Sequence, residues 1–427
     1  MIRAALLALA AAASAALAFT AAAQASTWCG AATGADLLPQ AVGGPSIHLI
    51  YAYPTDGADR LSEFGTTMQT DAETIDGWWR AQDPARAPRF DTFGFGCGAQ
   101  LDITDVKLAS TAAELVPYDG RFQRIVTSVA GAGLTSPYEV YVVYYDGPDD
   151  QGRVCGETAL RDPNSGPRFA MVYTGACTGE PTATTAAHEL THALGAVIAP
   201  APHECPPPND GHVCDYPHDL MYPFADGTPL SRLGLDIGRD DYYGAAGIGF
   251  DVRASRWLRH VDEPTAHVSV VFRGGAGTVT SDVPGVLCST TCASEWDAGQ
   301  TVMLKAEPAS GQRFVRWSGS CTGGGDCAIT TAGTPTVTAL FAPQTFSLTI
   351  GLSGAGSILN SAAGTVCSRR CRLAVTSYEP VTLRAVAKPS WRFKRWVGGC
   401  KGPRPTCRLP MTAATTTTAV FAKRPKT

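Results

Sequence analysis

The C-terminal part of the chain repeats itself with a period of about 79 residues, and this repeat limits the folds that the chain can adopt. Cys288 and Cys292 recur as Cys367 and Cys371. The same shift relates four further pairs: Gly277 and Gly356, Phe314 and Phe393, Trp317 and Trp396, and Cys321 and Cys400. The chain therefore holds two copies of one small module, which follow a region of different character.

Each copy reads as a small β module. Thr- and Val-rich segments alternate apolar and polar residues between Gly-rich turns, a pattern that predicts short strands. Each copy also holds four cysteines, and a core of ~75 residues is small enough to need disulfides. We therefore expect two all-β, disulfide-stapled modules, repeat 1 over residues 266–342 and repeat 2 over residues 346–422.

The motif F-x-x-W-x-G-x-C occurs in both copies, at Phe314–Cys321 and at Phe393–Cys400. The two units resemble the divergent InlB B-type repeats found in secreted bacterial proteins, and the resemblance covers about residues 266 to 422. It implies spacer or adhesive modules rather than enzymes. We expect Trp317 and Trp396 to lie in the module cores rather than to bind a ligand.

Charge divides the chain into an acidic and a basic part. Residues 264–427 hold 18 of the 34 Lys and Arg but only 6 of the 38 Asp and Glu, so residues 1–263 carry 16 against 32, a net charge of −16. Repeat 2 is the most basic part, because residues 346–427 hold 14 Lys and Arg and one acid. Such a surface attracts an anionic cell-surface polymer; a basic face without a partner is the alternative. No specific nucleic-acid partner is expected.

The first 25 residues have the composition of a secretory signal peptide. Met1-Ile2-Arg3 is positively charged, residues 4–23 are mostly apolar, and Ala23-Gln24-Ala25 is a cleavage motif. No later apolar run approaches the ~20 residues of a membrane span, so no transmembrane segment is expected. Of the 14 cysteines, six precede residue 260 and eight follow it, which suits two separately cross-linked regions. The sequence thus predicts a secreted, extracellular protein.

A motif in the acidic part reads H-E-x-x-H-x-x-G, from His188 to Gly195. Threonines after Pro181 suit a helix start and Gly195 suits a helix end. On a helix of about three turns, His188 and His192 lie on one face, where both can bind one zinc ion. Glu189 can then take a proton from a water molecule on the zinc. The alternative is an amphipathic helix with two surface histidines.

This motif resembles the zincin metallopeptidases, and among them the metzincins. The metzincin pattern continues with a histidine three residues after the glycine, where this chain has Ile198. A third ligand must therefore come from further on. Met221, within Asp219–Pro223, resembles the Met-turn beneath the metal, with ordinary core filling as the alternative. The resemblance implies a catalytic domain over residues 26–262 that uses zinc and Glu189.

Five residues are candidates for the third zinc ligand: His203, His212, His218, Asp215 and Asp219. Two of them, His203 and His212, flank a loop that a Cys205–Cys214 disulfide would close. We prefer His212, because it lies just ahead of the Met-turn and follows a flexible Asp-Gly pair, and place His203 second. Asp215 or Asp219 would suit a role in orienting a ligand histidine.

The region before the motif reads as a mixture of strands and helices. Strands are predicted at residues 47–53, 138–145 and 169–173, and helices at residues 66–80 and 121–130. We therefore expect an α+β, zincin-like catalytic domain followed by the two repeats.

The preferred interpretation is a secreted zinc-dependent endopeptidase for protein or peptide substrates. Its zinc ligands would be His188, His192 and His212, and Glu189 would be the general base. The alternative is a non-enzymatic, secreted surface-binding or adhesive protein in which the metal is structural or absent. His48, alone on the first predicted strand, is expected to be a sheet residue rather than a ligand.

Overall fold

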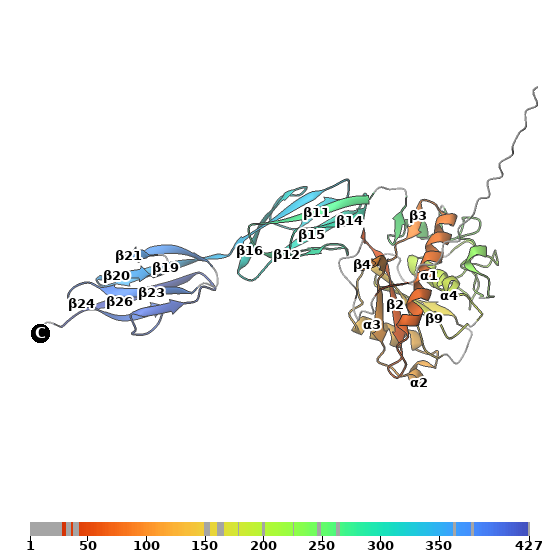
Figure 1. The fold of residues 1–427 in the computed structure, drawn as a ribbon, viewed down its shortest axis with the longest axis horizontal. Helices are drawn as coiled ribbons and strands as arrows, with labels where there is room; N and C mark the ends of the chain where they lie inside the picture. The colour runs from red at the N-terminus through yellow and green to blue at the C-terminus, as the bar shows by residue number, and fades with distance from the viewer. Residues whose placement is uncertain are drawn as a thin grey trace, which may run out of the picture.

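The computed structural model describes residues 28–30, 36, 42–148, 154–159, 166–177, 179–198, 201–224, 226–245, 249–261, 265–361, 364–376 and 380–425. The signal peptide expected over residues 1–25 lies outside this part. Figure 1 shows three bodies in a row, a domain of helices and strands followed by two β modules. None of the described helices combines the length with the apolar composition of a membrane span.

A five-stranded sheet forms the centre of the first domain. Its order is β6-β2-β7-β9-β8, where the first four strands run parallel and β8 runs antiparallel to β9. The strand bounds are Ser46–Tyr53 for β2, Ile103–Lys107 for β6, Glu139–Tyr145 for β7, Gly156–Thr158 for β8 and Arg168–Tyr173 for β9. The central strands β2 and β7 are buried along their whole length, as expected of parallel strands covered on both faces.

Helices cover both faces of this sheet. Helix α1, Leu61–Gln82, and helix α4, Thr182–Leu194, share one core with alternate residues of β2. Helix α3, Arg121–Gly131, packs on the other face, where the intervening β2 residues point. The five elements expected before the motif are all present, and α1 extends beyond the predicted 66–80. The short strand β8 had no counterpart in the sequence prediction.

Smaller elements complete the first domain. Their bounds are Val42–Gly43 for β1, Arg86–Pro88 for β3, Thr92–Phe95 for β4, Gly98–Leu101 for β5, Ala112–Leu115 for α2, Leu230–Arg232 for η1, Val252–Ala254 for η2 and Leu258–His260 for β10. His48 is fully buried, with Nδ1 3.0 Å from a carboxylate oxygen of Asp91 and Nε2 2.8 Å from the hydroxyl of Thr104. His48 lies on strand β2, within the sheet, as its predicted strand position implies.

The two repeats fold in the same way, each as two packed sheets. Repeat 1 has β14-β11-β18-β16 in one sheet and β13-β12-β15-β17 in the other, and repeat 2 has β22-β19-β26-β24 and β21-β20-β23-β25. The strands of repeat 1 are Thr265–Arg273 (β11), Gly277–Ser281 (β12), Leu287–Cys288 (β13), Cys292–Asp297 (β14), Thr301–Pro308 (β15), Gln312–Gly319 (β16), Cys327–Thr330 (β17) and Thr336–Pro343 (β18). Those of repeat 2 are Thr345–Ser353 (β19), Gly356–Asn360 (β20), Thr365–Cys367 (β21), Cys371–Thr376 (β22), Val381–Ala387 (β23), Trp391–Gly398 (β24), Thr406–Leu409 (β25) and Thr415–Lys423 (β26).

The core and the cross-links of the repeats follow the repeated motif. Trp317 and Trp396 are buried, 1% and 2% exposed, so their prediction as core residues is confirmed. The cysteines pair within each repeat, as Cys288–Cys292, Cys321–Cys327, Cys367–Cys371 and Cys400–Cys407. In the first domain they pair as Cys29–Cys97, Cys155–Cys177 and Cys205–Cys214. Both regions are therefore cross-linked internally, as the even counts predicted.

A strand of the first domain belongs to the sheet of repeat 1. Strand β1 runs parallel to β14 and pairs Val42 with Glu295 and Gly43 with Trp296. A side chain at Gly43 would collide with the Trp296 ring, since a Cβ there would lie 2.6 Å from a ring carbon. Beside this contact, Arg89 and Asp297 form a buried ion pair. The boundary between first domain and repeat 1 is therefore a packed joint.

Replacement of Arg89 by alanine is expected to lower the free energy of unfolding by roughly 3–5 kcal/mol. Arg89 and Asp297 are 5% and 4% exposed, so the variant would leave the Asp297 carboxylate buried without its partner. Urea unfolding of the full chain measures the change. An Arg89→Met, Asp297→Leu double variant removes both charges and should recover most of the loss. A loss below about 1 kcal/mol in Arg89→Ala would contradict a stabilising joint.

Candidate metal centre

Helix α4 carries the H-E-x-x-H-x-x-G motif and ends as its sequence predicts. Pro181 occupies the N-cap position, and Gly195 follows the last turn in the left-handed conformation with φ 118°. Glycine adopts this conformation without the steric penalty that a side chain brings. Most of the helix is buried against α1 and the sheet, and this packing fixes the face on which His188 and His192 lie.

The structure brings His188, His192 and His212 together. The ring centroids are 4.9 Å apart for His188 and His192, 5.2 Å for His188 and His212, and 4.9 Å for His192 and His212. One nitrogen of each ring lies within 4.8 Å of the others. The distances suit three ligands of one ion.

Hydrogen bonds fix two of these rings. Nδ1 of His188 donates to the carbonyl of Leu220 at 2.6 Å, and Nδ1 of His212 donates to the carbonyl of Asn209 at 3.2 Å. A neutral imidazole has one N–H, so both rings have their lone pair on Nε2. The Nε2 atoms of His192 and His212 face each other at 3.4 Å. Backbone carbonyls are common outer partners of metal-bound histidine and set its tautomer in this way.

The three imidazoles are held in the uncharged form that binds a metal. Burial, together with the neighbouring His212, lowers the pKa of His188 to about 4. Burial, with the proximity of the other two rings, lowers the pKa of His192 well below its usual value. Burial also lowers the pKa of His212. Three uncharged nitrogen donors that face one point fit a zinc ion, which prefers this donor type.

Glu189 lies beside the histidines and is buried from bulk water. Its Oε2 accepts a hydrogen bond of 2.8 Å from the hydroxyl of Thr158 on β8. Burial raises the pKa of Glu189 to about 8. Gly156 makes room for this carboxyl, because a Cβ there would lie 2.4 Å from Cγ of Glu189. Strand β8 therefore positions the general base expected from the sequence.

The turn that contains Met221 holds two of the three histidines in place through backbone hydrogen bonds. Met221 is fully buried, and its carbonyl accepts from the N–H of Val213, beside His212, at 3.0 Å. Asp219 accepts from the N–H of Met221 at 2.8 Å and from the hydroxyl of Tyr242 at 2.7 Å. Asp219 therefore holds the turn whose Leu220 carbonyl orients His188, and it is not grouped with the three histidines.

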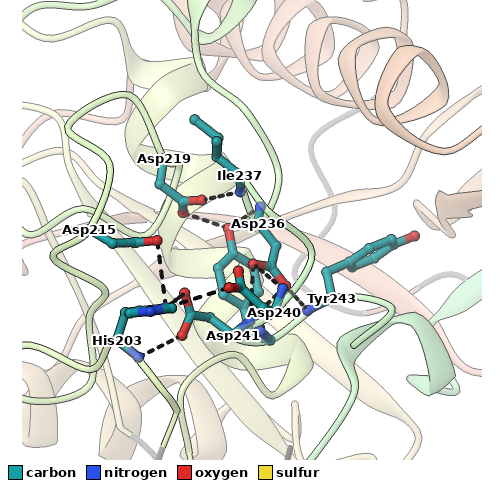
Figure 2. A network of polar contacts seen from close by, with 9 residues as sticks. His203, Asp215, Asp219, Asp236, Ile237, Asp240, Asp241 and Tyr243 are labelled. Atoms are coloured by element: carbon teal, nitrogen blue, oxygen red, sulfur yellow. Dashed lines mark hydrogen bonds and ion pairs between the residues drawn. The ribbon is translucent and has the colours of Figure 1, made fainter. Parts of the chain in front are cut away.

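The second-choice ligand, His203, lies in a different cluster. Figure 2 shows His203 directed towards Asp215, Asp240 and Asp241, whose nearest oxygens lie 3.6, 3.8 and 3.2 Å from its Nδ1. These carboxylates raise the pKa of His203, which is exposed. His203 and Asp215 thus lie outside the histidine group. His218, the remaining candidate, is absent from that group as well.

A cleft of about 450 Å³ opens at the three histidines. Its walls come from α4, from the edge strand β8, and from the segment that includes His212 and Met221. Cys155 and Gly156 of the β8 region line it, together with Tyr222 and Phe224 after the Met-turn. The sequence prediction missed β8 and its Thr158, because three residues are too short for an alternating pattern. The one feature of the sequence that marks this strand is Gly156 next to Cys155.

Comparison with known families gives a match in the repeats. The family model described as the divergent InlB B-repeat domain matches residues 270–345 and 357–425. The resemblance of both repeats to this domain is therefore confirmed. A search of the curated proteins found no match.

Several solved structures are similar to this chain at low identity. The Bacillus anthracis TIE protein is 10% identical with a TM-score of 0.25, and the match covers 36% of this chain and 33% of that one. Metalloproteinase-II from Bacteroides fragilis is 18% identical with a TM-score of 0.29, covering 46% of this chain and 52% of that one. Wild-type OgpA from Akkermansia muciniphila is 10% identical with a TM-score of 0.28, covering 90% and 96%. The chain thus spans about a third of the length of the first structure and about half of the second.

Proposed function

We propose that this chain is a secreted zinc-dependent endopeptidase whose catalytic domain extends over residues 26–262. The observation that supports it most is the meeting of three uncharged imidazoles and one buried carboxyl group, that of Glu189, in an open cleft. A structural zinc site has four protein ligands and no open position. Here the group holds three histidines among the described residues, which favours catalysis over a structural metal.

The proposed roles follow from the positions of the side chains. His188, His192 and His212 would hold zinc through Nε2, and the ion supplies Lewis acidity that polarises a peptide carbonyl and lowers the pKa of water to about 7. Glu189 accepts a proton from the attacking water and then donates it to the departing amine. The hydroxyl of Thr158 keeps the Glu189 carboxylate oriented towards the cleft.

The proposed substrate is an extended peptide segment. Strand β8 pairs with β9 on one side and is the edge of the sheet, and Gly156, Glu157 and Thr158 of this strand line the cleft. An extended peptide can add to such an edge through main-chain hydrogen bonds. A peptide bound along β8 would pass beside Glu189 and the three histidines.

Zinc removal tests the proposal. The purified full chain is expected to contain one zinc ion, to cleave casein, to lose cleavage after dialysis against 1,10-phenanthroline, and to regain it with added zinc. Circular dichroism should be unchanged throughout, because the core of the first domain is packed independently of the three histidine nitrogens. A folded, metal-free protein that cleaves casein at the original rate would contradict the proposal. A folded, metal-free protein that does not cleave would favour the adhesive alternative.

We further propose that repeat 2 attaches the protein to an anionic cell-surface polymer. Its strand β24 exposes Arg392, Lys394 and Arg395, and Arg372 is exposed on β22 of the same sheet. Strand β14 of repeat 1, in the place of β22, includes the acid Glu295. The basic charge is therefore concentrated in repeat 2.

Binding to dextran sulfate is expected to weaken roughly 10- to 1,000-fold between 50 and 200 mM salt, by analogy with other polyanions. An Arg392→Ser, Lys394→Ser, Arg395→Ser variant should weaken binding at low salt and reduce this salt dependence, since fewer counterions are released. The matched control changes the corresponding Arg313 and Arg316 on β16 of repeat 1, with a smaller effect expected. Salt-insensitive retention, or no retention at low salt, would contradict the proposed attachment.

A further inference from the structure

Three carboxylates meet at the central sheet, away from the proposed zinc centre. Oxygens of Asp36, Asp91 and Asp102 and a nitrogen of His48 lie within 4.8 Å of one another. Because side chains alternate along a strand, His48 points to the same side of β2 as Ile50. That side holds the core beneath α3, whereas α4 packs on the other side. The carboxylate group is therefore separate from the three histidines.

The three acids come from segments that the fold brings to β2. The N–H of Asp91 donates to the carbonyl of Ile47 at 2.8 Å, and the N–H of Asp102 donates to the carbonyl of Asp91 at 3.2 Å. Asp102 immediately precedes β6, which pairs with β2, and Asp36 lies ahead of β1. Asp91 and Asp102 are 2% and 1% exposed. Like charges this close together and this deeply buried repel each other, and a cation between them would relieve the repulsion.

One carboxylate oxygen in the group lacks a hydrogen-bond partner although it is buried. The side chain of Asp91 is 1% exposed, and its Oδ2 lies 3.0 Å from Nδ1 of His48. Its other oxygen, Oδ1, is buried and accepts no hydrogen bond from the described residues, and the same holds for Oδ1 of Asp36. A buried carboxylate oxygen without a donor has lost its hydration without compensation. Two such oxygens, on carboxylates that lie together, indicate a bound cation.

His48 orients this group rather than binding the ion. A carboxylate oxygen can only accept, so Nδ1 of His48 donates to Asp91. Nε2 of the same ring lies 2.8 Å from the hydroxyl of Thr104. Both ring nitrogens are thereby engaged, and the site offers oxygen ligands, one of which has His48 as its outer partner.

We infer that Asp36, Asp91 and Asp102 bind a calcium ion. Calcium takes about six to eight oxygen ligands at roughly 2.3–2.6 Å, so oxygens on opposite sides of one ion lie about 5 Å apart. Carboxylates can bind it through one oxygen or both. Magnesium usually retains several waters, which suits an open site better than one with buried acids, and zinc prefers nitrogen and sulfur donors. The inference does not depend on the proposed endopeptidase function.

The ion would connect the segment ahead of β1 to the centre of the sheet, and would therefore stabilise the first domain. Thermal unfolding of the zinc-loaded full chain, dialysed into calcium-free buffer, tests this. Calcium at 10 mM is expected to raise the unfolding temperature by about 3–10 °C, for a Kd of about 10⁻⁴–10⁻³ M. Magnesium at the same concentration should give less than a third of this shift. Calorimetric titration with calcium measures the affinity directly.

Two variants assign the binding to residues. Asp91→Asn keeps an oxygen that accepts from His48 but removes the charge, and it is expected to weaken calcium binding at least tenfold and to remove most of the thermal shift. Asp36→Asn changes the least buried of the three acids and should have the same effect, even if Asp91→Asn does not fold. The control is Asp119→Asn, the same change at an exposed acid between α2 and α3, which should keep both the affinity and the shift.

Three results would overturn the inference. The first is the absence of both a thermal shift and calorimetric binding at 10 mM calcium. The second is an equal shift with magnesium and calcium, which would indicate general screening of an acidic domain. The third is unchanged calcium affinity in Asp36→Asn and in Asp91→Asn, since the ion would then bind elsewhere. None of these results bears on zinc binding or peptide cleavage.

Discussion

Replacement of Glu189 by glutamine is expected to reduce peptide hydrolysis by roughly 10²- to 10⁴-fold while zinc binding is retained. The amide has the shape of the carboxyl and can still accept from Thr158, so the buried contact of 2.8 Å is preserved. It cannot take a proton from water at neutral pH. Initial cleavage rates of a fluorogenic peptide, with zinc content measured on the same samples, give both quantities.

The control for this variant is Glu63→Gln, on the exposed face of α1, and it is expected to cleave at the wild-type rate.

Thermal stability of the metal-free chain gives a second check on Glu189. Burial raises the pKa of Glu189 from its usual value to about 8 in the folded chain. As the pH rises from the usual pKa to about 8, the unfolded chain loses this proton before the folded chain does, so the free energy of unfolding falls. The glutamine variant should therefore unfold at no lower temperature than wild type at pH 9. Undiminished cleavage with full zinc content would remove Glu189 from the mechanism.

Replacement of His212 by alanine is expected to weaken zinc binding by more than about 100-fold, beyond the effect of losing an outer partner of a ligand. The expectation follows from its ring, whose Nε2 lies 3.4 Å from that of His192. Competition with a chromophoric chelator measures the affinity. Cleavage should be lost in parallel, because the remaining two histidines leave the ion without its third protein ligand.

The matched control is His203→Ala, the same change on the other side of the Cys205–Cys214 disulfide. His203 is exposed and surrounded by Asp215, Asp240 and Asp241, so zinc affinity should change less than about twofold in this variant. If His203→Ala lost zinc and His212→Ala retained it, the assignment of the third ligand would be reversed.

The sequence predicted the helix of this centre better than its loops. The i,i+4 spacing of His188 and His192 determines that both side chains lie on one helical face, whatever the rest of the fold. The choice between His212 and His203 depends on tertiary contacts that no local pattern encodes. Backbone hydrogen bonds of Cys205 to His212 and of Cys214 to His203 hold the loop, and packing of Val213 against Met221 turns His212 towards α4.

In the fold as well, the segments with a long apolar pattern were predictable from the sequence and the very short strands were not. The β2, β7 and β9 strands were predictable, because continuous apolar runs in a mixed α and β region indicate buried parallel strands. The repeats were predictable because Cys288, Cys292, Trp317 and Cys321 each recur 79 residues later. Strands β8 and β1 were not predictable, since they have three and two residues and form only through long-range pairing.

The parallel pairing of β1 with β14 has a consequence for synthesis. Val42 and Glu295 are partners although roughly 250 residues separate them, and the chain emerges from the ribosome N-terminus first. The whole first domain is therefore synthesised before β14, the strand with which its first strand β1 pairs. Until then, β1 presents unpaired backbone groups and Trp296 has not yet covered Gly43. The pairing of β1 with β14 can therefore form only after repeat 1 has been synthesised.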